Sequence, residues 1–171
     1  MKDKISVFWF RRDLRLSDNH GLFKALETSE NVLPIFIFDT DILSKLENKE
    51  DKRVDFIMQT LQTLNEYLEK SGKAIQIFYG KPLNVFKDLI KNYKIENVIC
   101  NEDYEPSAIQ RDLEIAEFLN ENGIDFLTFK DQVHFHKDDI LKADGIPYTI
   151  YTPYSKKWLL QYNDGEREFY P

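Results

Sequence analysis

The chain has 171 residues, a formal net charge of −7, and 13 Phe and 9 Tyr among its side chains. This length suits one domain with a sizeable core, and the aromatic content fits a packed core of that kind. The negative charge argues against a domain that grips a nucleic-acid backbone by itself, because such binding depends on clustered Lys and Arg.

The sequence contains no apolar segment that approaches the roughly 20 residues of a membrane-spanning helix. The N-terminal residues also lack the pattern of a signal peptide. We therefore expect no membrane partner and a cytoplasmic location.

Five apolar runs alternate with amphipathic segments along the first 130 residues. The expected strands are residues 5–10, 32–38, 74–79, 97–101 and 125–129. The expected helices are residues 18–28, 51–70, a segment that opens at 80–82, and 106–122, with Leu26 and Met58 among their apolar positions. This alternation predicts an α/β protein with a Rossmann-like three-layer α/β/α fold and a five-stranded parallel sheet. Residues 1–130 would form this core, and residues 131–171 a C-terminal extension whose last residues, 163–171, have no core to join.

Charged side chains follow three of the expected strands, at residues 11–13, 39–41 and 102–105. In a doubly wound sheet the first and fourth strands are typically neighbours, and ligands bind in the crevice at the carboxyl ends of the strands. The three loops can therefore converge on one site. Carboxylates there would accept hydrogen bonds from a heterocycle, an arginine would meet its carbonyl or phosphate group, and an aromatic wall would stack on the ring.

The first of these clusters has two interpretations. In one, Asp13 and Asp18 pair with the arginines of the same loop, Arg12 and Arg15, and fix its path. In the other, one arginine stays free and presents its planar fork to an anionic or flavin-like ligand. The acidic clusters also have a second interpretation, as solvent-exposed residues at the start of each loop. This interpretation is favoured for Asp41 and Glu102.

The remaining reactive side chains point to no further chemistry. A single cysteine, Cys100, rules out an internal disulfide or a Cys-based zinc site, and we expect a buried, inert thiol. His134 and His136 lack the other ligands that a metal needs, so no metal site is expected. Trp9 is expected in the core, and Trp158 is expected to pack the C-terminal tail onto the domain.

Residues 9–19, WFRRDLRLSDN, closely resemble the opening signature of the DNA photolyase and cryptochrome family. Later stretches agree in order and spacing, among them the Asp-x-Glu-Pro motif at 103–106 and the segment 148–158. The resemblance covers nearly the whole chain. It implies the family's N-terminal Rossmann-like domain, which holds a light-harvesting antenna chromophore.

The resemblance also implies a set of cofactor-binding residues and no catalytic ones. Flavin and deazaflavin antennas of the family lie in a cleft whose matching residues here are Arg11, Phe36, Ile37, Phe38, Asp39, Arg53, Asp103, Tyr104 and Glu105. Without the resemblance, Arg53 would read as a surface residue. Folate antennas instead use an Asn-Glu pair at the positions of Ser107 and Ala108, which supply no carboxylate. A flavin or deazaflavin antenna is therefore favoured over a folate.

The family's redox chemistry belongs to FAD in a C-terminal helical domain, which this sequence does not contain. Residues 131–171 are accordingly expected to lead to the interdomain linker, and the isolated domain is expected to be inactive. Its partner would be its own FAD domain, and DNA would be bound only by the full-length protein.

Three functions remain open. The full-length protein would be a deoxyribodipyrimidine photolyase, a carbon-carbon lyase that repairs ultraviolet-damaged DNA with blue light. It would alternatively be a cryptochrome photoreceptor. A third possibility is a stand-alone nucleotide-binding module, although the chain contains neither a G-x-G-x-x-G motif nor a P-loop.

Overall fold

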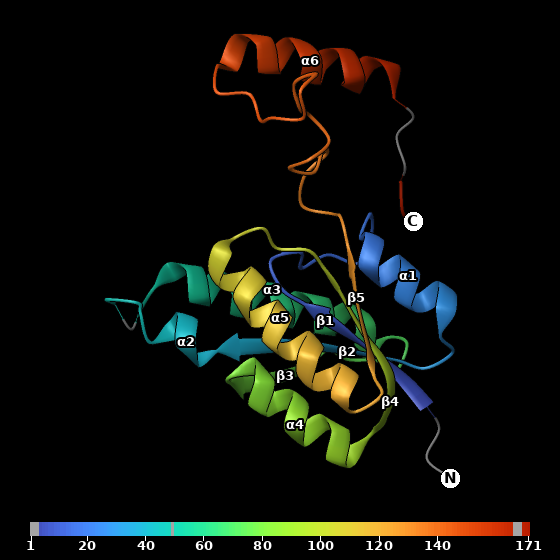
Figure 1. Cartoon of the computed structure of the whole chain (residues 1–171). Helices are drawn as coiled ribbons and strands as arrows, with labels where there is room; N and C mark the ends of the chain where they lie inside the picture. Colours follow the sequence, from blue (N-terminus) through green and yellow to red (C-terminus); the bar gives the residue numbers. More distant parts are fainter. Residues whose placement is uncertain (1–3, 49, 166–168) are drawn as a thin grey trace.

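A computed structural model describes residues 4–48, 50–165 and 169–171, and it contains one central parallel sheet (Figure 1). The sheet order is β3-β2-β1-β4-β5, and every neighbouring pair is parallel. The strands are β1 (Lys4–Phe10), β2 (Val32–Asp39), β3 (Gln76–Gly80), β4 (Lys94–Asn101) and β5 (Asp125–Phe129). The prediction of a five-stranded parallel α/β fold is confirmed.

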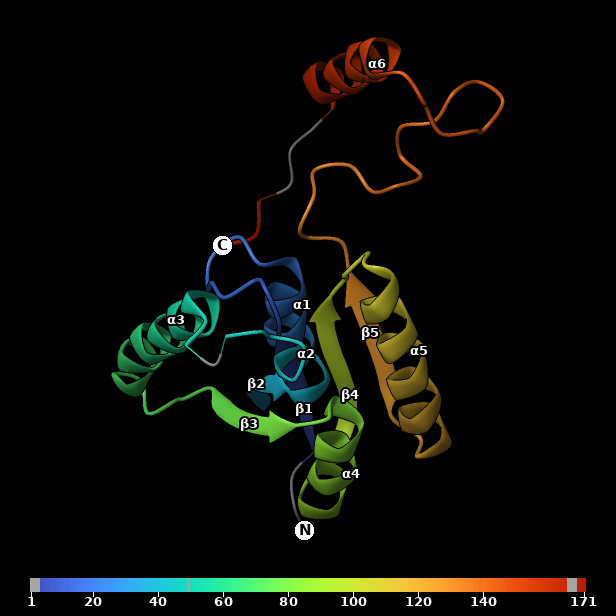
Figure 2. The same ribbon diagram turned by 90° about the vertical axis from the view of Figure 1, so that its left-hand side faces the viewer.

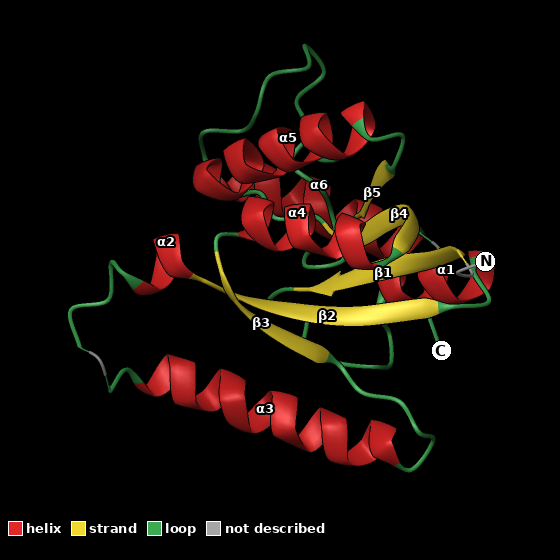
Figure 3. Ribbon diagram, turned by 90° about the horizontal axis from the view of Figure 1, so that it is seen from below, coloured by secondary structure: helices red, strands yellow, loops and turns green. Residues whose placement is uncertain are grey.

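Helices cover both faces of this sheet, with α4 and α5 on one side and α1 and α3 on the other (Figures 2 and 3). The helices are α1 (His20–Thr28), α2 (Thr40–Leu43), α3 (Lys52–Glu69), α4 (Pro82–Asn92), α5 (Pro106–Glu121) and α6 (Tyr151–Asp164). Because side chains alternate along a strand, β1 supplies both layers. Trp9 packs in the core under α4 and α5, whereas Phe8 and Phe10 pack in the core under α1 and α3.

Two apolar positions expected on the buried helix faces are exposed. Leu26 of α1 is 62% exposed and Met58 of α3 is 47% exposed, so these two expectations are wrong. Leu61 is the buried residue of α3, and Ile57, Leu64 and Leu68 pack partly against the core. Since α3 lies over the β3 edge of the sheet (Figure 3), only a narrow strip of the helix finds a partner.

The C-terminal extension has a small aromatic cluster of its own. Trp158 of α6 stacks on Tyr162 at 4.9 Å between ring centroids and contacts Phe135 edge-on at 5.4 Å. It therefore packs within the extension rather than against the sheet. None of the described helices is both long enough and apolar enough to cross a membrane.

The end of the chain returns to the domain. Tyr170 stacks on His20, at the start of α1, with the ring centroids 4.1 Å apart and the planes 5° from parallel. The backbone N–H of Asp18 donates to the Tyr170 carbonyl at 2.6 Å. The expectation that residues 163–171 have nothing to join is thus wrong for Tyr170, because an aromatic side chain reaches α1 from the opposite end of the sequence.

Candidate functional site

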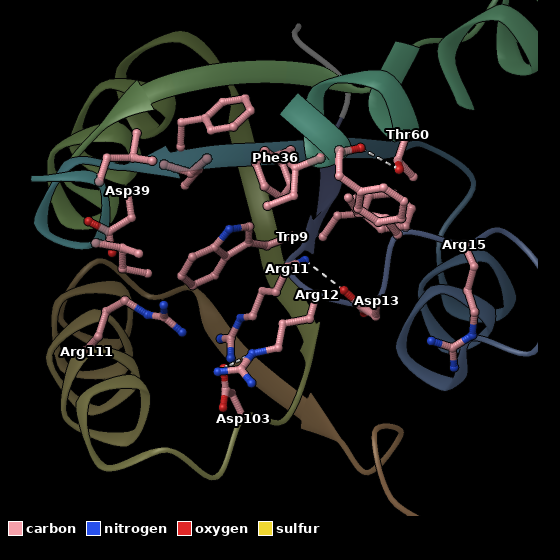
Figure 4. A pocket seen from close by; sticks show the side chains of 18 residues that line it. Trp9, Arg11, Arg12, Asp13, Arg15, Phe36, Asp39, Thr60, Asp103 and Arg111 are labelled. Atoms are coloured by element: carbon pink, nitrogen blue, oxygen red, sulfur yellow. Dashed lines mark hydrogen bonds and ion pairs between the residues drawn. The ribbon is translucent and has the colours of Figure 1, made fainter. Parts of the chain in front are cut away.

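A cavity of about 490 Å³ opens at the carboxyl edge of the sheet (Figure 4). It lies where β1, β2 and the loop after β4 meet, and residues of α2 and α3 also line it. Its lining residues are Trp9, Phe10, Arg11, Arg12, Asp13, Leu14, Arg15, Phe36, Ile37, Phe38, Asp39, Ile42, Leu43, Phe56, Ile57, Thr60, Asp103 and Arg111. The three loops at 11–13, 39–41 and 102–105, which the sequence predicted to converge, thus each contribute to one site.

The walls of the cavity are largely aromatic and aliphatic. Trp9 and Phe10 come from β1, Phe36 and Phe38 from β2, and Phe56 from α3. Ring faces and edges of this kind favour stacked or edge-on contact with a planar guest. Phe56 is 70% exposed, so the α3 side of the cavity is the open one.

A buried hydrogen-bond network fixes the loop after β1. The Asp13 carboxylate accepts the backbone N–H of Arg11 at 2.7 Å and the side-chain amide of Asn101. Asn101 also donates to Asn19, and its oxygen accepts the backbone N–H of Gly21 at 2.8 Å. Because buried polar groups are costly unless they are paired, this network holds the loop in one path. Asn101 was not among the site residues predicted from the sequence, where it is only an amide side chain at the end of an apolar strand.

The side chain of Arg11, which belongs to this loop, is buried and makes three contacts. Its Nη1 pairs with Asp112 at 2.8 Å, its Nη2 donates to the Sγ of Cys100 at 2.9 Å, and its Cζ lies 4.4 Å from the centroid of Trp9. The Nε of Arg11 is buried and has no hydrogen-bond partner within the described part of the chain. A donor of this kind suits an acceptor atom on a bound molecule.

Arg12 and Arg15 extend from the same loop toward different partners. Arg12 is half exposed and pairs with Asp103 at 3.2 Å and Glu105 at 2.8 Å. The hydrogen bond that Arg12 donates to the Glu105 carboxylate is the main cause that raises the pKa of the Arg12 guanidinium. Arg15 pairs with the buried carboxylate of Asp131 at 2.7 Å.

These contacts correct the interpretation of the loop as internally paired. The Asp13 carboxylate binds the backbone and Asn101, and Asp18 meets Arg15 only through its carbonyl oxygen. The arginines instead pair with carboxylates from distant parts of the sequence. The sequence could not indicate those partners, because they come next to the loop only through the sheet order.

The residues that the family resemblance implied do not all lie at this cavity. Those that line it are Arg11, Phe36, Ile37, Phe38, Asp39 and Asp103. Tyr104 is outside it and 51% exposed. Glu105 faces a neighbouring polar cavity of about 420 Å³. Arg53 is at the start of α3, fully on the surface, and pairs with Asp51 at 2.6 Å.

The polar cavity adjoins the aromatic one. Both are lined by Arg12, Asp39, Ile42, Asp103 and Arg111. Charged side chains of both signs surround it, and Lys81 pairs with Asp41 at 3.0 Å. Neither Lys81 nor Arg111 carried a signal in the sequence. Among the described residues there is no group of three or more His, Cys, Asp or Glu side chains that could hold a metal ion, and His136 pairs with Glu102 at 2.9 Å.

Comparison with known proteins identifies the family. The family model for DNA photolyase matches residues 6–169, so the chain belongs to the DNA photolyase family and corresponds to its N-terminal α/β domain. A deoxyribodipyrimidine photo-lyase of Synechococcus sp. is 34% identical over 155 residues, which are 91% of this chain and 32% of the relative. The blue-light photoreceptor PHR2 of Arabidopsis thaliana is 27% identical over 149 residues, covering 84% of this chain and 33% of that protein.

A solved structure shows the same architecture. The archaeal photolyase of Sulfolobus tokodaii, described with two FAD molecules and a novel light-harvesting cofactor, superposes with a TM-score of 0.80 at 30% identity. The match covers 97% of this chain and 36% of that one. The chain therefore spans about a third of the length of the proteins that it matches.

Proposed function

We propose that this chain is the antenna-chromophore-binding domain of a deoxyribodipyrimidine photolyase. Its family membership and the names of its relatives support the class of protein. The single observation that carries the binding role is the aromatic cavity at the sheet edge, with Arg11 among its lining residues.

The residues present fit a flavin or deazaflavin. A volume of about 490 Å³ is within the range of pockets that hold small organic molecules. The ring would stack among Trp9, Phe36 and Phe56, Arg11 would donate to a ring carbonyl, and Asp39 would accept from a ring N–H or hydroxyl group. When bound, such a group absorbs light and passes on the excitation energy.

The adjoining polar cavity would take the tail of the same molecule. Its cations include Lys45, Lys81 and Arg12, and carboxylates such as Asp41 and Glu105 balance them. A balanced set of donors and acceptors suits a hydroxylated chain. Ser107 and Ala108 offer no carboxylate there, which favours a flavin type over a folate.

The rest of the proposal concerns the whole protein. Repair of ultraviolet-damaged DNA would use FAD held by a helical domain beyond this one, and DNA would be bound by the complete protein. The antenna domain would then be inactive in repair when it is alone. A blue-light receptor of the cryptochrome type is the second candidate, and the similarity to the Arabidopsis photoreceptor favours it.

Two experiments test these proposals. Titrating the 171-residue chain with riboflavin, a deazaflavin and a folate, while following ligand fluorescence, should show saturable binding of the first two and weaker binding of the folate. The absence of binding by either tricyclic ring would remove the antenna proposal. Repair of damaged DNA by the complete protein under blue light separates the photolyase from the receptor, because a receptor leaves the damage in place.

A further inference from the structure

Trp9, in the wall of the cavity, lies close to two arginine side chains. The Cζ atoms of Arg11 and Arg111 lie 4.4 Å and 4.9 Å from the centroid of its ring. The Asp112 carboxylate joins the two guanidinium groups, at 2.8 Å from Arg11 and 3.1 Å from Arg111. Two cations and one anion leave an excess of one positive charge beside the indole.

Two further side chains that contact this cluster are uncharged. Burial raises the pKa of the Cys100 thiol to about 12, so the sulfur that Arg11 touches is neutral at ordinary pH. On another side, Phe86 contacts the indole edge-on at 5.3 Å. Trp9 is only 2% exposed, and charges act more strongly where little water screens them.

A tryptophan in this position can quench the excited state of a chromophore bound in the cavity. A photo-excited flavin ring is a strong one-electron oxidant, and an indole is among the most easily oxidised side chains. If Trp9 gave up an electron, the indole would become a radical cation, the guest would be reduced by one electron, and the return of that electron would dissipate the excitation. A positive charge over the indole opposes the first of these steps, because it destabilises the radical cation.

We propose that Arg11 and Arg111, bridged by Asp112, keep Trp9 difficult to oxidise and so preserve the excited state of a chromophore in the cavity. This inference rests on the proposed function, since it requires a light-absorbing guest. The arginines act through Trp9, and neither takes part in an electron transfer.

The electrostatic part is measured without any ligand. In a Trp158→Phe background, Trp9 is the only tryptophan, because the chain has two. Oxidation by azide radicals in pulse radiolysis gives a ratio of tryptophan to tyrosine radicals that reports the potential of Trp9. Arg111→Gln should raise this ratio about tenfold, which corresponds to about 59 mV for a one-electron couple. Asp112→Asn should lower it about tenfold, and Arg111→Lys should change it less than twofold.

Arg111→Gln and Asp112→Asn should change the ratio of tryptophan to tyrosine radicals in opposite directions, and this difference tests the proposal. Loosened packing would shift the two charge variants in the same direction, so equal shifts or no shift would overturn the proposal. If Arg111→Gln does not fold, Asp112→Asn decides by itself, because it keeps the shape of the side chain and changes only its charge.

The consequence for a guest is measured with bound riboflavin. Arg111→Gln should shorten its fluorescence lifetime through about tenfold faster quenching, and adding Trp9→Phe should restore the lifetime. An unchanged lifetime in Arg111→Gln would reject the protective role while leaving the antenna proposal intact. If neither riboflavin nor the deazaflavin binds, the antenna proposal fails, and with it the protective role.

Discussion

The guanidinium of Arg12 and the carboxylate of Asp103 lie 3.2 Å apart and join the loop after β1 to the loop after β4. The Asp103 side chain is 6% exposed, whereas that of Arg12 is 50% exposed. Asp103 also accepts the backbone N–H of Glu105 at 3.2 Å, so one buried carboxylate orders both the arginine and the start of α5. The shape of the cavity mouth therefore depends on Asp103 more than on its exposed neighbours.

Replacing Asp103 should weaken ligand binding. In Asp103→Asn the amide no longer holds Arg12 by charge and offers the ligand no carboxylate. We expect the riboflavin affinity to fall about tenfold, which is about 1.4 kcal/mol. Fluorescence titration measures this change.

Glu105→Gln is the matched control for this variant. The Glu105 side chain is 53% exposed and faces the neighbouring cavity. Because exposed ion pairs contribute only about 0–1 kcal/mol, its effect on affinity should be less than about fivefold. Equal losses in the two variants would contradict the distinction drawn between them.

Asn101 should be among the most sensitive polar positions for stability. Asn101→Ala removes the buried partner of the Asp13 Oδ2 and of the Gly21 N–H, whereas the Asn19 oxygen keeps its bond from the Leu22 N–H. We expect a loss of about 3 kcal/mol, because each unsatisfied buried group costs about 1–3 kcal/mol. This corresponds to a fall in Tm of about 6–12 °C for a chain of this size. Asn122→Ala, which removes only an exposed bond to the Phe118 carbonyl, should cost less than about 1 kcal/mol.

Gly21 should resist even a methyl group. A Cβ there would lie 2.6 Å from the Oδ1 of Asn101 and 3.1 Å from the ring of Phe8. Inside a helix, alanine is ordinarily about 1 kcal/mol more favourable than glycine. Here the contacts outweigh propensity, and Gly21→Ala should destabilise by about 2 kcal/mol in urea unfolding. In an Asn101→Ala background the closest atom is gone, so the cost should fall by at least about half, and additive effects would contradict this account.

The sequence predicted the sheet well because strand burial is a local pattern. The run at 125–129 became β5 with the same limits, and the run at 5–10 became most of β1. Helix α6 was not predicted, since its partners His134 and Phe135 lie outside the sheet and impose no simple period. The sequence of an amphipathic segment does not indicate which surface its apolar face will pack against.

The site was predictable only where strands end. The loops at 11–13 and 39–41 and the residue Asp103 meet because parallel strands bring their carboxyl ends to one edge. Phe56 and Arg111 come from helices, whose rotation relative to the sheet is a tertiary property. The ion-pair partner of Arg11 is 101 residues away in the sequence, so no local pattern indicates it.

Cys100 should make stability depend on alkaline pH. Burial raises the pKa of its thiol from 9.0 to about 12 in the folded chain. Below pH 9 the thiol is protonated in both states and stability is unaffected. Between pH 9 and about 12 the unfolded thiol ionises while the folded one does not, so the unfolded state binds fewer protons and stability falls. The loss should be about 1.4 kcal/mol per pH unit in this window.

The Cys100→Ala variant separates this effect from the other alkaline groups. Tyrosines and lysines titrate equally in both proteins, so the difference between their unfolding free energies isolates the thiol. That difference should be constant below pH 9 and should move in favour of the variant above it. Parallel curves up to pH 11 would show that the thiol is accessible to water in the folded state.

The contact between Tyr170 and His20 should hold the end of the chain on the domain. Tyr170→Ala removes the stacked ring at 4.1 Å and its contact with Phe23, and we expect a loss of about 1 kcal/mol. The Asp18 loop, whose backbone bonds to Tyr170, should then become more accessible to protease. Phe169→Ala is the matched control, because that ring is 69% exposed and should be nearly neutral. Limited proteolysis followed by mass spectrometry measures cleavage near residue 18, and equal cleavage rates in the two variants would show that the stacked ring does not secure the tail.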